Sequence, residues 1–261
     1  MPTSDAAVDA ALMDELTKIV VRAAAAILER STRAGMRIKA DGSPVTDADE
    51  TAEAIICESL ARTAPGVAVI SEEQSAREAP TAAMRGSYFL VDPLDGTREF
   101  IAGRDEYTIN IALIADGVPA LGIICAPALG EYWRGIVGTG ADRFTANGTP
   151  IPMRTRPRPR GETVVVLSRS HLDADTRAYV EAIPNAKTLQ SGSSIKFCRI
   201  AEGSADLYPR LAPTHDWDIA AGHAILQAAG GSVTAPDGTA LIYGTKDLLI
   251  PGFIAQGDIR D

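Results

Sequence analysis

The segment that most constrains this chain is VDPLDGT, residues 91–97. The apolar residues before it predict a buried strand over residues 87–92 that ends at Asp92. Pro93 fixes its own φ and has no N–H, so the chain must turn there. Asp92 and Asp95 lie three residues apart across that turn, and both carboxylates can face one point. The residues that follow can open a helix whose free N–H groups point outward.

This segment places oxygen ligands beside a helix N-terminus, as a Mg²⁺–phosphate site requires. A turn closed by a structural Asp has the same local pattern, so both interpretations stay open. Two further acids also stand where apolar segments begin or end. Glu72 follows a short apolar run, and Asp218 begins an apolar helix. Such acids are usually solvated or favour a helix dipole, and several share one site only if cations neutralise them.

Length and charge narrow the class of protein. The chain has 261 residues and a formal net charge of −9. It can form one large α/β domain or two small ones, and its acidity argues against a protein that coats nucleic acid. Three cysteines, Cys57, Cys125 and Cys198, show no paired spacing, so buried free thiols and a reducing compartment are expected.

Hydropathy indicates a soluble protein. No secretory signal is found, and no apolar run reaches the ~18 residues of a membrane span. A cytoplasmic protein is expected, with peripheral contact at the inner membrane left open. The pattern specifies no oligomeric state.

The apolar periodicity of the first half predicts both helices and strands. In the expected N-terminal helix, one face is formed by the apolar residues Leu12, Leu16, Ile19, Val20, Ala23, Ile27 and Leu28. The next expected elements are a helix over about residues 48–62, strands over 67–71 and 87–92, and an antiparallel meander over 107–146. Turns are expected at Asp116-Gly117 and Asn147-Gly148.

Alternating Arg and Pro over residues 154–161 predict a solvated linker rather than a nucleic-acid contact, because Pro blocks regular structure and the run is short. The elements expected beyond it are a strand over 163–167, helices over 173–182 and 193–202, a strand over 205–211 and a helix over 217–229. The chain therefore reads as an α/β (α+β) protein. We expect an α+β half over residues 1–153 and a smaller α/β half over 162–261.

Four motifs in this order resemble the inositol-monophosphatase-like phosphatases over almost the whole chain. They are Pro44-Val45-Thr46 with Asp49, Ser71-Glu72-Glu73, Asp92-Pro93-Leu94-Asp95-Gly96-Thr97, and Trp217-Asp218 with Ala220-Ala221-Gly222. The resemblance implies a layered αβαβα sandwich of the inositol monophosphatase/fructose-1,6-bisphosphatase type. It also implies a Mg²⁺-dependent phosphomonoesterase with two to three ions, and inhibition by Li⁺.

The resemblance further assigns metal ligands. Glu72, Asp92 and the backbone carbonyl of Leu94 would hold one Mg²⁺. Asp92 would bridge to a second ion held by Asp95 and Asp218. Such hard oxygen ligands suit Mg²⁺, whereas imidazole does not, so His215 and His223 are not expected as ligands.

Catalytic roles are implied in the same way. A water would lose its proton to the pair Asp49 and Thr97, or to Glu72, and attack phosphorus. Asp49 would also help Glu72 to hold a third, weaker ion. The amides of Gly96 and Thr97 would hold the phosphate. No protein nucleophile is needed, because phosphoryl transfer rests mostly on positioning and charge stabilisation.

A closer resemblance is to the 3'(2'),5'-bisphosphate nucleotidase branch. It rests on Arg98-Glu99-Phe100, Ser168-Arg169-Ser170-His171, Gly192-Ser193-Ser194-Ile195-Lys196-Phe197 and Ala205-Asp206-Leu207-Tyr208-Pro209-Arg210. It implies removal of the 3'-phosphate of adenosine 3',5'-bisphosphate, a by-product of sulfate activation, to give AMP and phosphate. The implied substrate contacts are Glu72, Gly96, Thr97, His171, Ser194, Lys196, Arg210 and Asp218.

Three alternatives remain at this point. An inositol monophosphatase, or a relative acting on another small phosphate ester, would have the same metal site. A regulatory protein could keep the fold without activity, although no metal carboxylate is missing. A nucleic-acid-binding module is disfavoured by the acidic balance.

Overall fold

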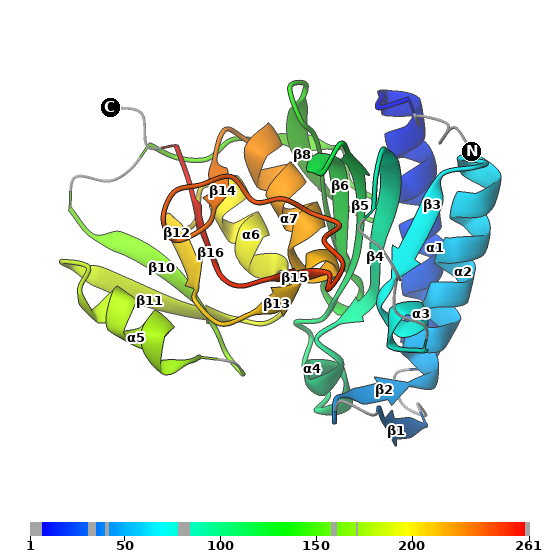
Figure 1. The fold of residues 1–261 in the computed structure, drawn as a ribbon, viewed down its shortest axis with the longest axis horizontal. Helices are drawn as coiled ribbons and strands as arrows, with labels where there is room; N and C mark the ends of the chain where they lie inside the picture. Colours follow the sequence, from blue (N-terminus) through cyan, green and yellow to red (C-terminus); the bar gives the residue numbers. More distant parts are fainter. Residues whose placement is uncertain are drawn as a thin grey trace.

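Five layers make up the computed structural model, which describes residues 7–30, 35–39, 42–77, 84–157, 161–170 and 172–258. Helices α1 (Ala10–Arg30) and α2 (Asp47–Thr63) form the first layer, beside a seven-stranded sheet. Helices α6 (Ile195–Ala201) and α7 (Asp216–Ala228) lie between this sheet and a five-stranded sheet (Figure 1). Helix α5 (Ala174–Glu181) covers the outer face of the small sheet. The predicted αβαβα sandwich is confirmed.

The seven-stranded sheet belongs to the first half of the chain. Its spatial order is β3 (Ala68–Ser71), β4 (Ser87–Asp95), β5 (Thr108–Ala115), β6 (Val118–Ala126), β7 (Glu131–Ile136), β8 (Gly140–Thr145) and β9 (Ile151–Met153). Only β3 and β4 are parallel, and the other neighbours form the predicted antiparallel meander. The turn at Asp116-Gly117 is confirmed, with φ of 50° and 81°.

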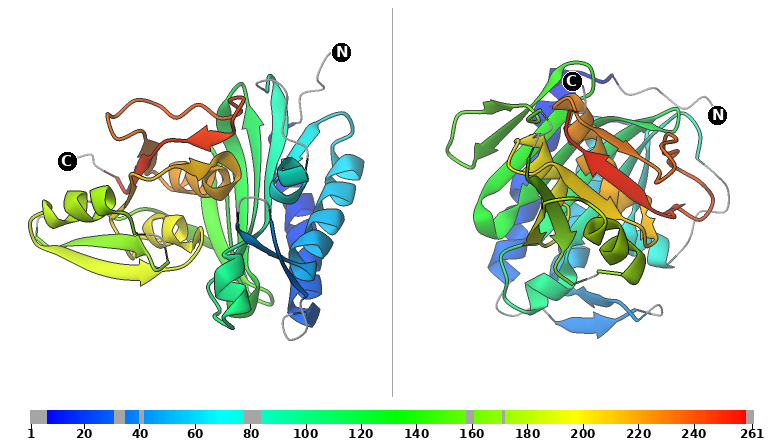
Figure 2. Two further views of the ribbon diagram at one scale, coloured as in Figure 1. Left: turned by 60° about the horizontal axis from the view of Figure 1, so that its bottom comes forward. Right: turned by 90° about the vertical axis from the view of Figure 1, so that its left-hand side faces the viewer.

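Strand β4 shows why the central strands have continuous apolar sequences. Phe89 and Val91 point to one face and pack with α1 and α2. Tyr88 and Leu90 point to the other face and join the core around α6 and α7. Because helices cover both faces, every second position is buried on each side. The left view of Figure 2 shows this sheet between its two helical layers.

The five-stranded sheet has the order β11 (Ala186–Ser191), β10 (Thr163–Ser168), β12 (Leu207–Arg210), β16 (Phe253–Gln256) and β14 (Ser232–Thr234). Strand β10 runs parallel to both neighbours, whereas β16 is antiparallel to β12 and β14. Two short pairs complete the strands: β1 (Met36–Ile38) with β2 (Pro44–Thr46), and β13 (Thr214–His215) with β15 (Leu249–Ile250). Short helices α3 (Glu72–Arg77) and α4 (Thr97–Ile101) follow β3 and β4, and a 3₁₀ turn spans Pro127–Leu129.

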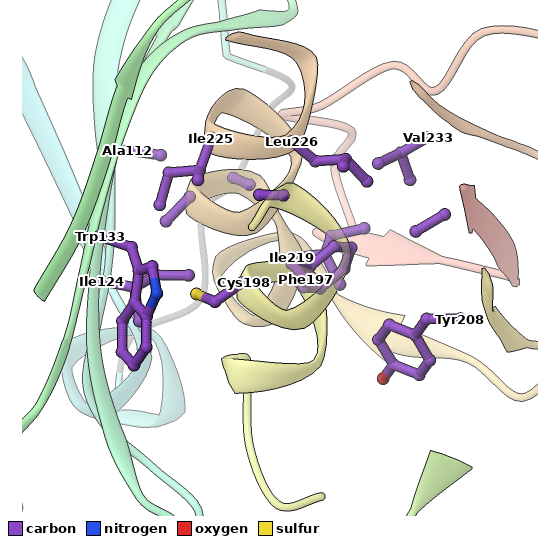
Figure 3. Packing of buried hydrophobic residues seen from close by; sticks show 14 of the residues in the cluster. Ala112, Ile124, Trp133, Phe197, Cys198, Tyr208, Ile219, Ile225, Leu226 and Val233 are labelled. Carbon is purple, nitrogen blue, oxygen red and sulfur yellow. The ribbon is translucent and has the colours of Figure 1, made fainter. Parts of the chain in front are cut away.

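A continuous core joins the two sheets through α6 and α7 (Figure 3). Trp133 and Ile124 of the large sheet lie near Cys198 of α6, and Val233 of the small sheet lies near Leu226 of α7. Helix α7 lies very close to the large sheet, since a Cβ at Gly122 would stand 2.5 Å from the Ala221 carbonyl oxygen. The division into halves 1–153 and 162–261 stays a prediction, and the apolar core crosses it.

Three sequence predictions need correction. Leu28 is 44% exposed, because it lies at the edge of the apolar face of α1. Cys57 is only half-buried, whereas Cys125 and Cys198 are buried, and all three are free thiols. The Arg/Pro segment is not wholly solvated: Arg156 makes two 2.7 Å hydrogen bonds to Asp206, and residues 158–160 lie outside the described residues. None of the described helices is long and apolar enough to cross a membrane.

Candidate active site

A cavity of about 290 Å³ opens between the ends of the two sheets. Ten of the residues expected at the site line it: Glu72, Asp92, Leu94, Asp95, Gly96, Thr97, Ser194, Lys196, Arg210 and Asp218. Asp49 lies behind this wall and reaches it through a hydrogen bond to Thr97. His171 lies outside the described residues. Glu72 and Asp218, which are 146 positions apart in sequence, thus share one cavity.

The VDPLDGT segment forms an irregular end to strand β4. The strand continues past Asp92 to Asp95, and its pairing with β5 shifts register between these two residues. The Leu94 N–H donates to Asp92 Oδ1 at 3.0 Å, which orients that carboxylate. Gly96 then takes φ of 90° and ends the strand, and Thr97 begins α4. A side chain at Gly96 would be strained and would approach the Glu106 carbonyl at 3.3 Å.

Asp49 has two kinds of partner. Its Oδ2 accepts from the Thr46 N–H at 2.8 Å, which caps helix α2. Its Oδ1 accepts from Thr97 Oγ1 at 3.0 Å, which links α2 to the cavity wall. Burial raises the pKa of Asp49, against the hydrogen bonds from Thr46 and Thr97 that favour the charged form. The structure therefore brings Asp49 and Thr97 into contact and gives Asp49 a structural role as well.

Four carboxylates around the cavity disturb one another. Asp92 is 1% exposed, and burial raises its pKa well above the ordinary value, with the charges of Glu72 and Asp95 adding to the rise. Burial raises the pKa of Glu72 to about 8, although the Lys39 ammonium opposes this. Burial and the charge of Asp218 also raise the pKa of Asp95. Such a concentration of carboxylates favours a bound cation.

Lys39 is the cation that the sequence reasoning missed. Its Nζ lies 2.7 Å from Glu72 Oε1 and 2.7 Å from Glu73 Oε1, and its side chain is 9% exposed. Burial alone would lower its pKa, but the two carboxylates outweigh burial and raise it. Lys39 follows the short strand β1, and no local pattern signals this contact, because hairpin packing creates it.

The donor set fits Mg²⁺. Among the described residues, no three acidic, histidine or cysteine side chains converge tightly enough to form a metal cage. Mg²⁺ does not need one, since it usually binds one or two carboxylates and keeps waters and substrate oxygens as its other ligands. The Leu94 carbonyl, which accepts from Thr97 Oγ1 at 3.2 Å, supplies a further oxygen at the same wall.

The two described histidines near α7 have other partners. Burial lowers the pKa of His223 to about 4, and its Nδ1 pairs with the Tyr243 hydroxyl at 2.9 Å. His215 stacks on Trp217.

Two cations also line the cavity, the buried Lys196 of α6 and the half-buried Arg210 of β12. Lys196 Nζ contacts the Ser193 carbonyl and lies 5.1 Å from the Tyr208 ring centroid. Arg210 Nη2 donates to the Pro213 carbonyl at 3.2 Å, but its buried Nε has no partner. Leaving such a donor unsatisfied costs about 1–3 kcal/mol, so an anionic ligand here would be favourable.

Ser193 is a second residue that sequence reasoning missed. Its hydroxyl donates to Asp95 Oδ2 at 2.6 Å, and its backbone has φ of 52°. Ser194, the residue implied by the resemblance, also lines the cavity, but its hydroxyl is within 2.8 Å of Asn110 and Thr108. Ser193 lies just before α6, and this position could have suggested a role for it. Only the tertiary structure shows that its hydroxyl, and not that of Ser194, reaches Asp95.

Polar contacts hold the two halves together at the cavity mouth. Arg169 Nη2 lies 2.7 Å from Glu106 Oε2, and the same oxygen accepts from the Gly192 N–H at 3.0 Å. Nearby, the Ser170 hydroxyl donates to Glu99. The loop after α4 is therefore joined to the loops after β10 and β11 at the cavity mouth.

Comparison with known proteins places the chain in a family. Residues 9–259 match the family model described as inositol monophosphatase family. CysQ of Escherichia coli K12, a 3'(2'),5'-bisphosphate nucleotidase, is 42% identical over 219 residues, covering 82% of this chain and 86% of that protein. The histidinol-phosphatase of Mycobacterium tuberculosis is 32% identical over 250 residues, covering 92% and 90%. The crystal structure of CysQ from Bacteroides thetaiotaomicron is 35% identical, with a TM-score of 0.78 and coverage of 95% and 97%. The chain belongs to the inositol monophosphatase family.

Proposed function

We propose that this protein is a Mg²⁺-dependent phosphomonoesterase that removes the 3'-phosphate of adenosine 3',5'-bisphosphate to give AMP and phosphate. One observation carries the proposal: a single cavity is lined by carboxylates of β4, α3 and α7 and by two cations, the buried Lys196 of α6 and the half-buried Arg210 of β12. A bisphosphate has one phosphate for the carboxylate-bound ions and one for these cations. The 42% identity to a nucleotidase over most of the chain supports the same substrate class.

On the acidic side, Glu72, Asp92, the Leu94 carbonyl, Asp95 and Asp218 would hold two to three Mg²⁺ ions. When bound, Mg²⁺ supplies charge that stabilises the attacking and leaving oxygens. Asp49 accepts from Thr97, so the Thr97 hydroxyl is oriented to take a hydrogen bond from a water and Asp49 can receive the proton. The backbone amides of Gly96 and Thr97 would hold the phosphate.

On the cationic side, Arg210 and Lys196 would bind the second phosphate. Arg210 can donate in a planar fork, whereas Lys196 is a compact point charge. Ser194 and Asp218 would contact the ribose, and His171 the nucleoside. An inositol monophosphate has no second phosphate to pair with these cations. A substrate with a positive charge, as histidinol phosphate has, would be repelled by them, so both alternatives fit this wall less well.

Several finer properties belong to this proposal. The family resemblance supports inhibition by Li⁺, which would compete for an oxygen-lined cation position. Removal of adenosine 3',5'-bisphosphate supports a role in sulfur assimilation. Free buried thiols support a cytoplasmic location.

The proposal is tested by phosphate release from four substrates with Mg²⁺ and with excess chelator. The substrates are adenosine 3',5'-bisphosphate, adenosine 2',5'-bisphosphate, inositol 1-phosphate and histidinol phosphate. We expect the highest kcat/KM for adenosine 3',5'-bisphosphate and no turnover in chelator. Full activity in chelator would overturn the metal dependence, and a preference for inositol 1-phosphate or histidinol phosphate would overturn the substrate.

A further inference from the structure

Two stacked rings stand in the cavity wall beside Asp218. The ring centroids of His215 and Trp217 are 4.6 Å apart, and the ring planes are 7° from parallel. Both residues line the cavity. Trp217 is 6% exposed, whereas His215 is exposed. The imidazole therefore covers one face of the indole and leaves its own outer face open.

The backbone of His215 is firmly held. It belongs to strand β13, where it pairs with Leu249 of β15. Its N–H donates to Asp218 Oδ2 at 3.1 Å, immediately before helix α7 begins. These contacts use the backbone and survive a side-chain substitution at 215, whereas the capping contact of the His215 side chain to the Asp218 N–H is lost equally in an Ala and in a Phe variant. A flat group fixed in this way loses little conformational entropy when a ligand stacks on it.

The other described rings at the cavity have no free face. Phe197 is 1% exposed and Tyr208 is 3% exposed, and the Lys196 ammonium lies over the Tyr208 ring. Among the described residues lining the cavity, His215 is thus the ring with an exposed face. A purine has two flat faces and gains most from a parallel ring at stacking distance.

We propose that the His215 imidazole, backed by Trp217, is the platform on which the nucleotide's purine base stacks. This inference rests on the proposed nucleotide substrate and adds the residue that selects for a base. The platform lies next to Asp218, in the wall of the cavity that the carboxylates and the two cations also line. A base can therefore stack on it within the same cavity that would hold both phosphates.

The kinetic test compares adenosine 3',5'-bisphosphate with 1,4-anhydroribitol 3,5-bisphosphate, which keeps the ribose ring and both phosphates but lacks the base. Base–aromatic stacking predicts that wild-type kcat/KM favours the nucleotide by about ten- to a hundredfold. His215→Ala should bring that ratio close to one, and the matched variant His215→Phe should retain most of it. An unchanged ratio in His215→Ala, or an equal loss in both variants, would overturn the platform. Turnover of both substrates at equal rates by wild type would overturn it too, while the phosphatase activity would stand.

A binding test needs no turnover. The chain has two tryptophans, and Trp133 is fully buried with its Nε1 3.4 Å from Glu202 Oε2, so a fluorescence change on ligand binding reports Trp217. AMP should bind wild type about tenfold or more tightly than ribose 5-phosphate, and His215→Ala should bind both alike. Equal affinities in wild type would overturn the platform. If AMP binds as expected and no bisphosphate is hydrolysed, the proposed function fails and the platform stands.

Discussion

At the scale of single residues, burial of the site's carboxylates raises their pKa values, and repulsion among them adds to the rise. Asp92 is almost fully buried, and burial together with Glu72 and Asp95 raises its pKa. The folded protein keeps these acids close although their charges oppose folding, and bound cations would remove that penalty. The carboxylates that the site needs for function therefore lower the stability of the metal-free protein.

We expect Asp92→Asn to abolish turnover and to raise the melting temperature of the metal-free protein at neutral pH. The amide removes a buried charge that Glu72 and Asp95 repel, but it cannot bridge two cations. Steady-state kinetics and thermal unfolding in chelator measure the two effects. Retention of more than about a tenth of wild-type kcat, equivalent to ~1.4 kcal/mol of barrier, would contradict the bridging role.

A second prediction concerns pH and Glu72. Its pKa rises from an ordinary 4.5 to about 8 in the folded, metal-free protein. Between pH 4.5 and pH 8 the folded state holds a proton on Glu72 that the unfolded chain has released. The stability that protonated Glu72 contributes is therefore complete below pH 4.5 and is lost as the pH rises toward 8. The test is urea unfolding in chelator at several pH values. As pH rises across this window, the free energy of unfolding of wild type should fall relative to that of Glu72→Gln. A difference that is constant or rises with pH would contradict the shift.

At the scale of elements, helix α7 links the fold to the site. It carries Asp218 at its first turn and packs directly on the large sheet, where Gly122 allows close approach to Ala221. The position of the Asp218 carboxylate is therefore set by the fit between a helix and a strand. A change in that fit should alter the site without touching any polar group.

Gly122→Ala tests this link. The new Cβ would stand 2.5 Å from the Ala221 carbonyl oxygen, so helix and sheet must separate. Overpacking of this kind costs about 1–3 kcal/mol of stability, and displacement of Asp218 should lower kcat as well. The matched control is Gly161→Ala, because a Cβ there meets no atom within 4 Å. Equal stability and activity in the two variants would show that the close contact does not position α7.

Most elements could be predicted from the sequence, because buried helices and strands have a clear apolar periodicity. The helix expected over residues 48–62 is α2, and the meander strands lie close to their expected positions. Strand β11 was missed because it is an exposed edge strand with no apolar alternation, and pairing with β10 stabilises it. Strand β16 was missed because it is short, and tertiary pairing determines it.

At the scale of the whole molecule, the cavity lies where the large sheet meets α6, α7 and the small sheet. The order of the motifs was enough to predict that Asp92, Asp95 and Asp218 share one site, because the family resemblance also implied the fold. Lys39 and Ser193 could not be predicted in this way, since their contacts depend on how a hairpin and a loop pack against distant carboxylates. Long-range packing therefore decides which polar side chains complete the site.

Arg210 and Lys196 are proposed to bind the second phosphate of the substrate. The measurement is kcat/KM for adenosine 3',5'-bisphosphate and for adenosine 3'-phosphate, in wild type and in Arg210→Ala. Each charge-assisted contact contributes about 1.5–3 kcal/mol, so wild type should prefer the bisphosphate by roughly ten- to a hundredfold and Arg210→Ala should lose most of that preference. Equal kcat/KM for both substrates in wild type, or an equal loss on both in Arg210→Ala, would contradict the account.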